Sequence, residues 1–373
     1  MDVKNREYYQ NEAFQAAKKS DFNCAILATV AFGKGRVISL IIEELYNRGC
    51  RSFLYCCDNQ RLRDIDFPNE LDKWLSKTIL SNIKITFECY QTTFRRTNIN
   101  DEVLLGDEFD MAITPQYSKT FFNNKFKHKI LVSGTLSPSK KQVLEQIVPI
   151  VYKFTTIDAE NAGIINKTAY YLYNYRMTES ESREYRKWTT AIAKAIAAEK
   201  PPNQINFLLG KRKEILYTLE SSYIHVRKVM KWLWDNDKKT RLIIFCERTT
   251  QADRVCKYSY YGGNENLDNL TKFQNNEISG LSVVSKIKRG INLKNTNTAI
   301  FESLAGSSTT EFEQKSGRMK RLNITELATV IIMLPWYSKI DQEGNKIYKP
   351  TIVDQWIHKS TSNLNITFKD LKL

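Results

Sequence analysis

Residues 28–35, ATVAFGKG, have the composition of a loop that holds phosphate groups. The loop follows an apolar run, CAILATV, and precedes an amphipathic run, RVISLIIEEL, which together predict a buried strand and then a helix. Backbone N–H groups and the helix N-terminus can cradle phosphates, and Lys34 adds a positive charge. Gly35 stands where the GxxxxGK[ST] pattern has a Mg²⁺-binding hydroxyl. A glycine turn before an ordinary helix would explain the same residues.

An acidic pair follows a second apolar run. The segment GDEFD, residues 106–110, comes after EVLL, so its carboxylates are expected where a strand ends. Asp107 could hold Mg²⁺ directly or through water, and Glu108 could polarise an attacking water molecule. A solvated acidic turn is the alternative interpretation.

Two arginines near the end of the second half could act on the same phosphates. In EQKSGRMKR, residues 313–321, Arg318 and Arg321 are three apart and would share a helix face. Guanidinium groups stabilise the charge of a phosphoryl group during its transfer. A basic, solvated helix is the alternative, but the order and spacing of the three segments favour nucleotide chemistry.

Short apolar runs alternate with amphipathic runs, which predicts mostly parallel sheets flanked by helices. We expect two domains of the same architecture, residues 1–165 and 166–373. In the first, SFLYCC, KITFECY and KILVS are predicted strands and 70–80 a helix. In the second, we expect helices at 178–200 and 211–235 and strands in RLIIFCE, LSVVSK, TAIFESL and ATVIIMLP.

The composition suggests a partner of high negative charge. The 373 residues carry 56 Lys and Arg against 41 Asp and Glu, a net charge of +15. Basic side chains that neutralise phosphates release condensed counterions, so nucleic acid is the expected partner. A merely basic surface would have the same composition.

Cysteine and histidine usage is informative about compartment. Seven cysteines, most of them in apolar runs, and the absence of a CxxC pair predict a reducing environment. Three scattered histidines predict no zinc site. The N-terminus is polar, and no apolar run reaches the roughly 20 residues of a membrane span. We therefore expect a cytoplasmic protein, in the host cytoplasm if it is phage-encoded.

In this order, the segments resemble the motifs of superfamily 2 helicases of the DEAD/DEAH type. ATVAFGKG resembles motif I, GDEFD motif II, SGT at 133–135 motif III and QKSGRMKR motif VI. The crossover PIVYKFTTIDAENAGIINK resembles the branch of restriction-enzyme motor subunits, XPB-like helicases and phage branch-migration helicases. The resemblance implies two tandem RecA-like domains with ATP and Mg²⁺ in the cleft between them.

The resemblance also implies roles for individual residues. It implies catalysis by Lys34, Asp107, Glu108, Gln314, Arg318 and Arg321, with Asp107 as metal ligand and Ser133 and Thr135 as coupling residues. It implies nucleotide binding by Arg6, Gln10, Ala31, Phe32, Gly33, Lys34, Gly35, Arg36, Gly290 and Asn292.

Three residues depart from the family pattern. Gly35 replaces the motif I threonine, so Mg²⁺ would be held by Asp107, water and phosphates alone. Ala31 replaces a common glycine, and Lys315 replaces the first arginine of motif VI. The other motif residues are retained, which favours an active ATPase.

Nucleic acid would contact loops on one face of both domains, mainly through phosphates and without sequence preference. The candidates are Arg61, Gln91, Thr92, Arg95, Lys286, Lys288 and Arg289, with Lys140, Lys141 and the run KRK at 211–213 as further basic positions.

The predicted function is an ATP-dependent DNA helicase or translocase that acts as a monomer, with a possible protein partner for substrate choice. A catalytically weakened, nucleotide-gated binding protein on the same scaffold is one alternative, for which Gly35 is the main argument. An RNA helicase is another, because backbone contacts do not reveal the sugar.

Overall fold

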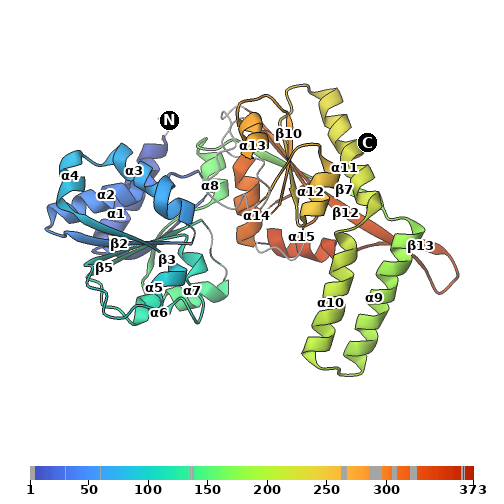
Figure 1. Cartoon of the computed structure of the whole chain (residues 1–373), viewed down its shortest axis with the longest axis horizontal. Coiled ribbons are helices and arrows are strands. Elements are labelled where there is room, and N and C mark those ends of the chain that lie inside the picture. The colour runs from blue at the N-terminus through green and yellow to red at the C-terminus, as the bar shows by residue number, and fades with distance from the viewer. Residues whose placement is uncertain are drawn as a thin grey trace. The chain divides into compact units, whose positions relative to one another are not determined.

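The computed structural model describes residues 5–29, 31–58, 60–134, 136, 138–261, 267–284, 296–304, 309–319, 326–362, 364 and 366–373. The chain divides into two compact units, Met1–Ile165 and Asn166–Leu373, each with its own elements (Figure 1). Within the described residues, no helix is both long and apolar enough to cross a bilayer. All seven cysteines are buried, and none forms a disulfide.

The first unit is built on a six-stranded sheet whose order is β3-β2-β4-β5-β1-β6. All its neighbouring strands are parallel, so their carboxyl ends lie at one edge. The strands are β1 (Asn23–Ala28), β2 (Ser52–Cys57), β3 (Lys84–Cys89), β4 (Val103–Asp107), β5 (His128–Ser133) and β6 (Ile150–Phe154).

Helices connect these strands, as expected for parallel pairs. They are α1 (Arg6–Lys19), α2 (Lys34–Asn47), α3 (Phe67–Trp74), α4 (Lys77–Asn82), α5 (Tyr90–Thr93), α6 (Lys119–Phe122), α7 (Pro138–Leu144) and α8 (Thr156–Asn161). Helix α2 buries the apolar stripe of the motif I segment, which packs against the sheet: Val37, Ile38, Ile41, Ile42 and Leu45.

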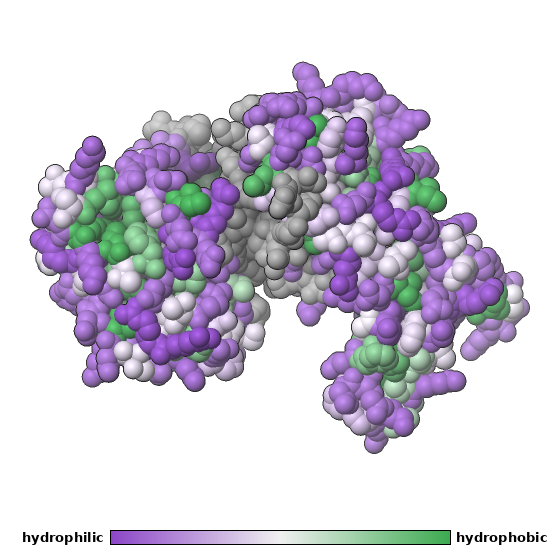
Figure 2. Space-filling view, viewed as in Figure 1, coloured by the Kyte–Doolittle hydropathy of each residue, from purple (hydrophilic) through white to green (hydrophobic). Residues whose placement is uncertain are grey.

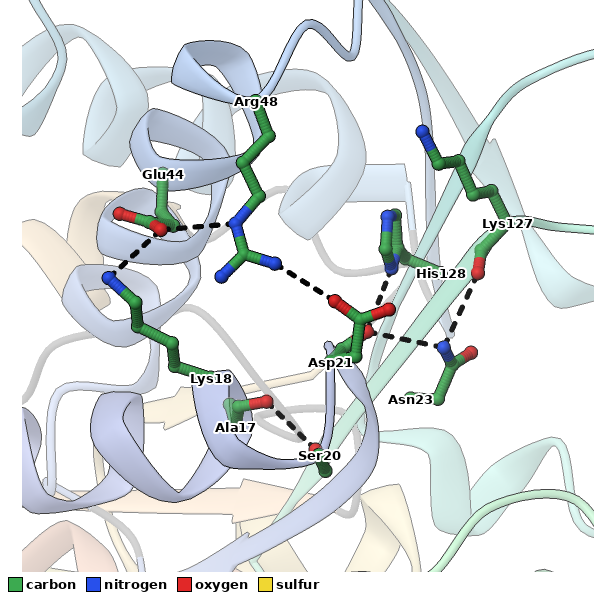
Figure 3. Close-up of polar contacts among 9 residues, drawn as sticks. All are labelled: Ala17, Lys18, Ser20, Asp21, Asn23, Glu44, Arg48, Lys127 and His128. Carbon is green, nitrogen blue, oxygen red and sulfur yellow. Dashed lines mark hydrogen bonds and ion pairs between the residues drawn. The ribbon is translucent and has the colours of Figure 1, made fainter.

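A polar network joins α1 to α2 at the end remote from the motif I loop (Figure 3). Glu44 accepts from Lys18 at 3.0 Å and from Arg48 at 3.1 Å. Arg48 also contacts Asp21 at 2.9 Å, and the Asp21 carbonyl lies 2.8 Å from His128 Nδ1. The Lys18 ammonium, which donates to Glu44, lowers the pKa of this carboxyl group. These contacts fix α1 on α2 and on the start of β5.

The second unit holds an eight-stranded sheet with the order β14-β7-β12-β11-β8-β10-β9. Strand β13 pairs antiparallel with β12, and the other pairs are parallel. The strands are β7 (Thr168–Arg176), β8 (Leu242–Cys246), β9 (Ser259–Tyr260), β10 (Gly280–Val284), β11 (Thr298–Phe301), β12 (Ala328–Ile340), β13 (Lys346–Pro350) and β14 (Phe368–Asp370).

Seven described helices accompany this sheet, and two of them, α9 and α10, form a hairpin that extends away from it (Figure 1). The helices are α9 (Glu179–Ala197), α10 (Pro202–Leu216), α11 (Glu220–Asn236), α12 (Thr249–Val255), α13 (Leu267–Gln274), α14 (Thr309–Ser316) and α15 (Val353–Thr361).

The two-domain α/β architecture is confirmed, but three predicted helices are wrong in detail. The helix predicted over 70–80 is broken, because Leu75 is extended and the Ser76 side chain caps a new helix, α4. Helix α10 begins at Pro202, since proline is tolerated in the first helical turn. The chain from 211 to 235 is interrupted between α10 and α11. Helix α14 ends at Ser316, and 317–319 form a 3₁₀ turn.

Candidate active site

A side chain of α1 contacts the backbone of the loop that follows β1. Gln10 is buried, and its Nε2 donates to the carbonyls of Phe32 at 2.8 Å and Gly33 at 3.4 Å. Gly33 has a φ of +87°, and a Cβ there would lie only 2.4 Å from Gln10 Nε2. The close approach of Gln10 therefore requires glycine at this position. Ala31 also has a positive φ, +68°, which costs a residue with a side chain on the order of 1 kcal/mol.

Two predicted nucleotide-binding residues have other contacts in the structure. The side chain of Phe32 is buried, and its ring packs 5.2 Å from Phe154. At Phe32, the backbone and not the side chain is therefore accessible to a ligand of the loop. Arg6 donates from Nη2 to the carbonyl of Ile164 at 3.2 Å, which ties the start of α1 to the last residues of the first unit.

The acidic pair stands at the carboxyl end of β4. Asp107 is buried; Tyr55 Oη donates to its Oδ2 at 3.0 Å, and the Glu108 amide donates to its Oδ1 at 2.9 Å. Burial, and next the Glu108 carboxylate, raise the pKa of Asp107 to about 6. Glu108 has a φ of +48°, a strained backbone of the kind that clusters at functional sites.

Three site residues lie in contact at this edge of the sheet: Lys34 at the start of α2, Glu108 just after β4 and Ser133 at the end of β5. Lys34 Nζ lies 3.4 Å from Glu108 Oε1. Ser133 Oγ, at the end of β5, donates to Glu108 Oε2 at 3.4 Å and to Asp110 Oδ1 at 3.0 Å. Since β5 lies between β4 and β1 in the sheet, Ser133 is placed between the loop and the acidic pair.

Gly35 has a close neighbour that the sequence analysis missed. A Cβ on Gly35 would lie 3.2 Å from Oε2 of Glu70 on α3. The same oxygen accepts from Trp74 Nε1 at 2.8 Å, and the Arg36 guanidinium lies 4.5 Å from the Trp74 ring. Arg36, a predicted nucleotide-binding residue, is thus stacked on α3, and the carboxylate of Glu70 lies beside the position of the missing side chain.

These residues fit a phosphate-bound magnesium ion. Asp107 is a buried carboxylate at the end of β4, and the Lys34 ammonium lies beside its neighbour Glu108. No cluster of three acidic, histidine or cysteine side chains for a metal occurs among the described residues. Mg²⁺ characteristically takes one or two carboxylates together with substrate phosphates and water, so one buried aspartate beside a lysine suits it.

The described nucleic-acid candidates come from two adjacent strands. Arg61 follows β2, and Gln91, Thr92 and Arg95 follow β3; all four are exposed. Gln91 Nε2 donates to the carbonyl of Asp58 at 3.1 Å and so joins the two loops. Arg61 pairs with Asp66 at 3.4 Å.

In the second unit, Lys315 is a buried structural cation. Its Nζ lies 3.2 Å from Glu247, just after β8, and 3.0 Å from Glu311. Burial alone would lower the pKa of Lys315, but the two carboxylates raise it above its usual value. The residue that replaces the first arginine of motif VI therefore anchors α14 to the end of β8.

A buried carboxyl group that the sequence analysis missed organises the same edge. Glu302 follows β11; Ser222 Oγ donates to it at 2.6 Å, and Gln251 Nε2 is a second donor. Gln251 Oε1 in turn accepts from the amides of Glu247 and Arg248. Burial is the main cause that raises the pKa of Glu302 to about 8.

Several predicted residues cannot be placed. Thr135, Lys286, Lys288, Arg289, Gly290, Asn292 and Arg321 lie outside the described residues, as do the side chains of Gln314 and Arg318.

Comparison with known proteins bears on the domain and the fold. Residues 224–323 match the family described as helicase conserved C-terminal domain. The fold resembles S. cerevisiae Dbp5 bound to RNA and ADP BeF3, with a TM-score of 0.58 and 13% identity over 97% of this chain and 89% of that one. It also resembles the Pyrococcus furiosus Hef helicase domain, with a TM-score of 0.55 and 12% identity over 94% of this chain and 97% of that one.

Residues 224–323 therefore match a helicase C-terminal domain, and the chain has the two-domain α/β fold of these helicase structures. The motif I and motif II segments stand at the same edge of the first sheet. No curated protein sequence matches the chain significantly.

Proposed function

We propose that the protein is a nucleic-acid-stimulated ATPase that moves along or remodels DNA, in the branch of restriction-enzyme motor subunits and phage branch-migration helicases. The observation that carries the proposal is the Lys34–Glu108 pair at 3.4 Å beside the buried Asp107. A lysine on a phosphate loop and two carboxylates at a neighbouring strand end are the parts that ATP hydrolysis requires.

ATP would be held through its base by Gln10 and Arg6 and through its phosphates by the loop of Gly33, Lys34 and Gly35. Asp107 would hold Mg²⁺, which supplies charge neutralisation on the phosphates when it is bound. Gln10 donates to the carbonyls of Phe32 and Gly33 in the phosphate loop. The side chain that would recognise the base therefore also holds the loop, which supports this assignment.

Glu108 would orient the attacking water. In the structure its two oxygens are engaged by Lys34 and Ser133. A phosphate group competes with Glu108 for Lys34, so nucleotide binding would release one oxygen of Glu108 for water. Ser133 stays as the link between Glu108 and Asp110, which suits the coupling role proposed for it together with Thr135.

The second unit would supply the charges that complete the site. We propose that Gln314, Arg318 and Arg321 of motif VI contact the γ-phosphate, with Gly290 and Asn292 of motif V nearby. Lys315 supports this proposal indirectly, because it is paired with Glu247 and Glu311 and so fixes α14 within its own unit.

A second candidate is a weakly catalytic, nucleotide-gated binding protein, and the Gly35 environment favours it. Glu70 adds a carboxylate beside the position where the family has a hydroxyl. If that carboxylate disturbs the metal, hydrolysis would be slow while nucleotide and nucleic acid still bind.

Phosphate release with and without single-stranded DNA or RNA tests the proposal. We expect hydrolysis that depends on Lys34 and is stimulated more by DNA than by RNA. Hydrolysis no higher than that of the Lys34→Ala variant would reject the enzyme, and nucleic-acid binding retained in that case would select the second candidate. Stronger stimulation by RNA would replace DNA as the track.

A further inference from the structure

The hairpin of α9 and α10 plays no part in the nucleotide site, yet its base is firmly anchored. Thr178 and Glu181 form a reciprocal cap at the start of α9. Glu181 Oε1 also accepts from the amide of Ser221 at 3.0 Å, which joins α9 to α11. The hairpin is thus a defined arm of the second unit.

The distal part of this arm is strongly basic. Between Lys187 and Lys213 the sequence has a single acidic residue, Glu199. Figure 2 shows apolar side chains among hydrophilic ones on the hairpin. The exposed apolar residues there are Ile196, Phe207 and Leu209, and Phe207 is 61% exposed. The basic residues are Lys187, Lys194, Lys200, Lys211, Arg212 and Lys213.

Two hollows adjoin along the hairpin. The first, about 670 Å³, is lined in part by Lys194, Lys200 and Phe207. The second, about 460 Å³, is lined in part by Phe207, Lys213 and Arg248. Phe207 lines both, so the two hollows meet at this residue. We call the two together the hairpin groove, lined in part by Lys194, Lys200, Phe207, Lys211, Lys213, Tyr217 and Arg248.

Cations and aromatic rings alternate along the groove. Lys211 Nζ lies 5.5 Å from the centre of the Phe207 ring. Further along, Lys213 Nζ and the Arg248 guanidinium lie 5.7 Å and 5.4 Å from the Tyr217 ring. Tyr217 is buried, so Phe207 supplies the exposed ring face. An aromatic face that stacks on a base, beside ammonium groups that contact phosphates, is a feature by which proteins bind single strands.

The groove ends at the carboxyl edge of the sheet. Arg248 comes two residues after β8 ends at Cys246, and ligands of parallel α/β sheets bind outside this edge. The two acidic residues that line the second hollow are already paired: Glu214 with Arg248 at 3.3 Å and Glu247 with Lys315 at 3.2 Å. The negative charge of these carboxylates is therefore offset.

We propose that the hairpin groove binds one nucleic-acid strand, with an unpaired base on Phe207 and phosphates on Lys194, Lys200 and Lys211. The inference rests on the proposed function, since it adds a strand contact outside the helicase motifs. A single strand fits better than a duplex, because an exposed ring can stack only on a base that is not already stacked in a helix.

Binding of the full-length protein to a labelled oligothymidylate of about 20 nucleotides, longer than the site of one small domain, tests the proposal. Phe207→Ala should weaken binding roughly tenfold, as loss of one base stack predicts. Its matched control is Phe122→Ala, an exposed phenylalanine of the first unit, which should bind as the wild type does.

Charge is tested with a second pair of variants. Lys200→Glu with Lys211→Glu should weaken binding and reduce the salt slope by about 1.4, or roughly 0.7 for each lost phosphate contact. Lys228→Glu with Lys231→Glu, which changes the same charge on exposed positions of α11, is the control. Circular dichroism should show unaltered folding, and hydrolysis without nucleic acid should be unchanged in every variant.

The outcomes separate this inference from the proposed function. If the wild type binds the strand but the groove variants bind as their controls do, the groove is not the site and the motor can stand. If the wild type binds neither DNA nor RNA, both proposals fail. If Phe207→Ala weakened binding of a blunt duplex as much as binding of the single strand, the stacking role of Phe207 would also be overturned.

Discussion

Gly35 and Glu70 are best understood as a pair. The residue that departs from motif I lies beside a carboxylate that a side chain would approach: a Cβ would come within 3.2 Å of Glu70 Oε2 and 3.3 Å of Glu70 Cγ. Glu70 is itself tied to Trp74, on which Arg36 stacks. The absence of the motif I hydroxyl is therefore accompanied by a specific packing arrangement, rather than by an empty space.

Restoring the family residue should destabilise the protein. In an ordinary helix, Gly→Thr is favourable by a few tenths of a kcal/mol. Here Gly35→Thr should instead lower the free energy of unfolding by about 1 kcal/mol, because Glu70 must move and lose its Trp74 hydrogen bond. Urea unfolding of Gly35→Thr, Glu70→Ala and the double variant measures the coupling. Additive effects of the two changes would show that the residues do not interact.

A second prediction at the residue scale concerns Glu302 and the dependence of the free energy of unfolding on pH. Burial raises its pKa from an ordinary 4.5 to about 8, so between these values the folded state holds a proton that the unfolded state releases. The contribution of Glu302 to the free energy of unfolding is thus fully present below pH 4.5. It falls by on the order of 3–5 kcal/mol as the pH rises to about 8.

The variant Glu302→Gln should remove this dependence. An amide can still accept from Gln251 and can donate to Ser222, so the network is kept. The variant should match the wild type near pH 4.5 and exceed it near pH 8 in chemical unfolding. The exposed Glu214→Gln is the control, and a constant difference between Glu302→Gln and the wild type at both pH values would contradict the assignment.

At the scale of elements, the sheet edge and the helices' apolar stripes were predictable, while several breaks were not. Strand β1, helix α2 and the acidic end of β4 follow from local periodicity. The break at Leu75 and Ser76 occurs inside an amphipathic run, so only the cap contact to Ile79 reveals it. The contacts of Glu70 and Tyr55 with the site join residues far apart in the chain, and no local pattern encodes them.

Helix α9 offers a prediction about the anchoring of the hairpin. Glu181 accepts from the amides of Thr178 at 2.8 Å and Ser221 at 3.0 Å. Removing both bonds with Glu181→Ala should lower the free energy of unfolding by about 1–2 kcal/mol. Glu184→Ala on the same helix removes only exposed side-chain contacts and should cost less than about 0.5 kcal/mol. Equal losses in thermal or urea unfolding would contradict the anchoring role.

At the scale of the whole molecule, the two units have separate cores. The buried apolar clusters around Ile38 and Leu104 belong to the first unit, and those around Phe301 and Val229 to the second. Among the described residues, no buried apolar cluster contains residues from both sides of the boundary between Ile165 and Asn166. Each unit therefore buries its own apolar surface, which is the requirement for independent folding.

Polypeptides 1–165 and 166–373 should consequently each fold alone. We expect a cooperative unfolding transition for each by circular dichroism, with nucleotide binding that depends on Lys34 retained by the first. A cut of the second polypeptide at residue 201, between α9 and α10, is the control; it separates β7 from β12, its neighbour over nine residue pairs, and should abolish folding of both products, 166–201 and 202–373. If the separated units unfold without cooperativity while the intact chain unfolds cooperatively, the two cores depend on each other. The prediction that the two units fold independently would then be wrong.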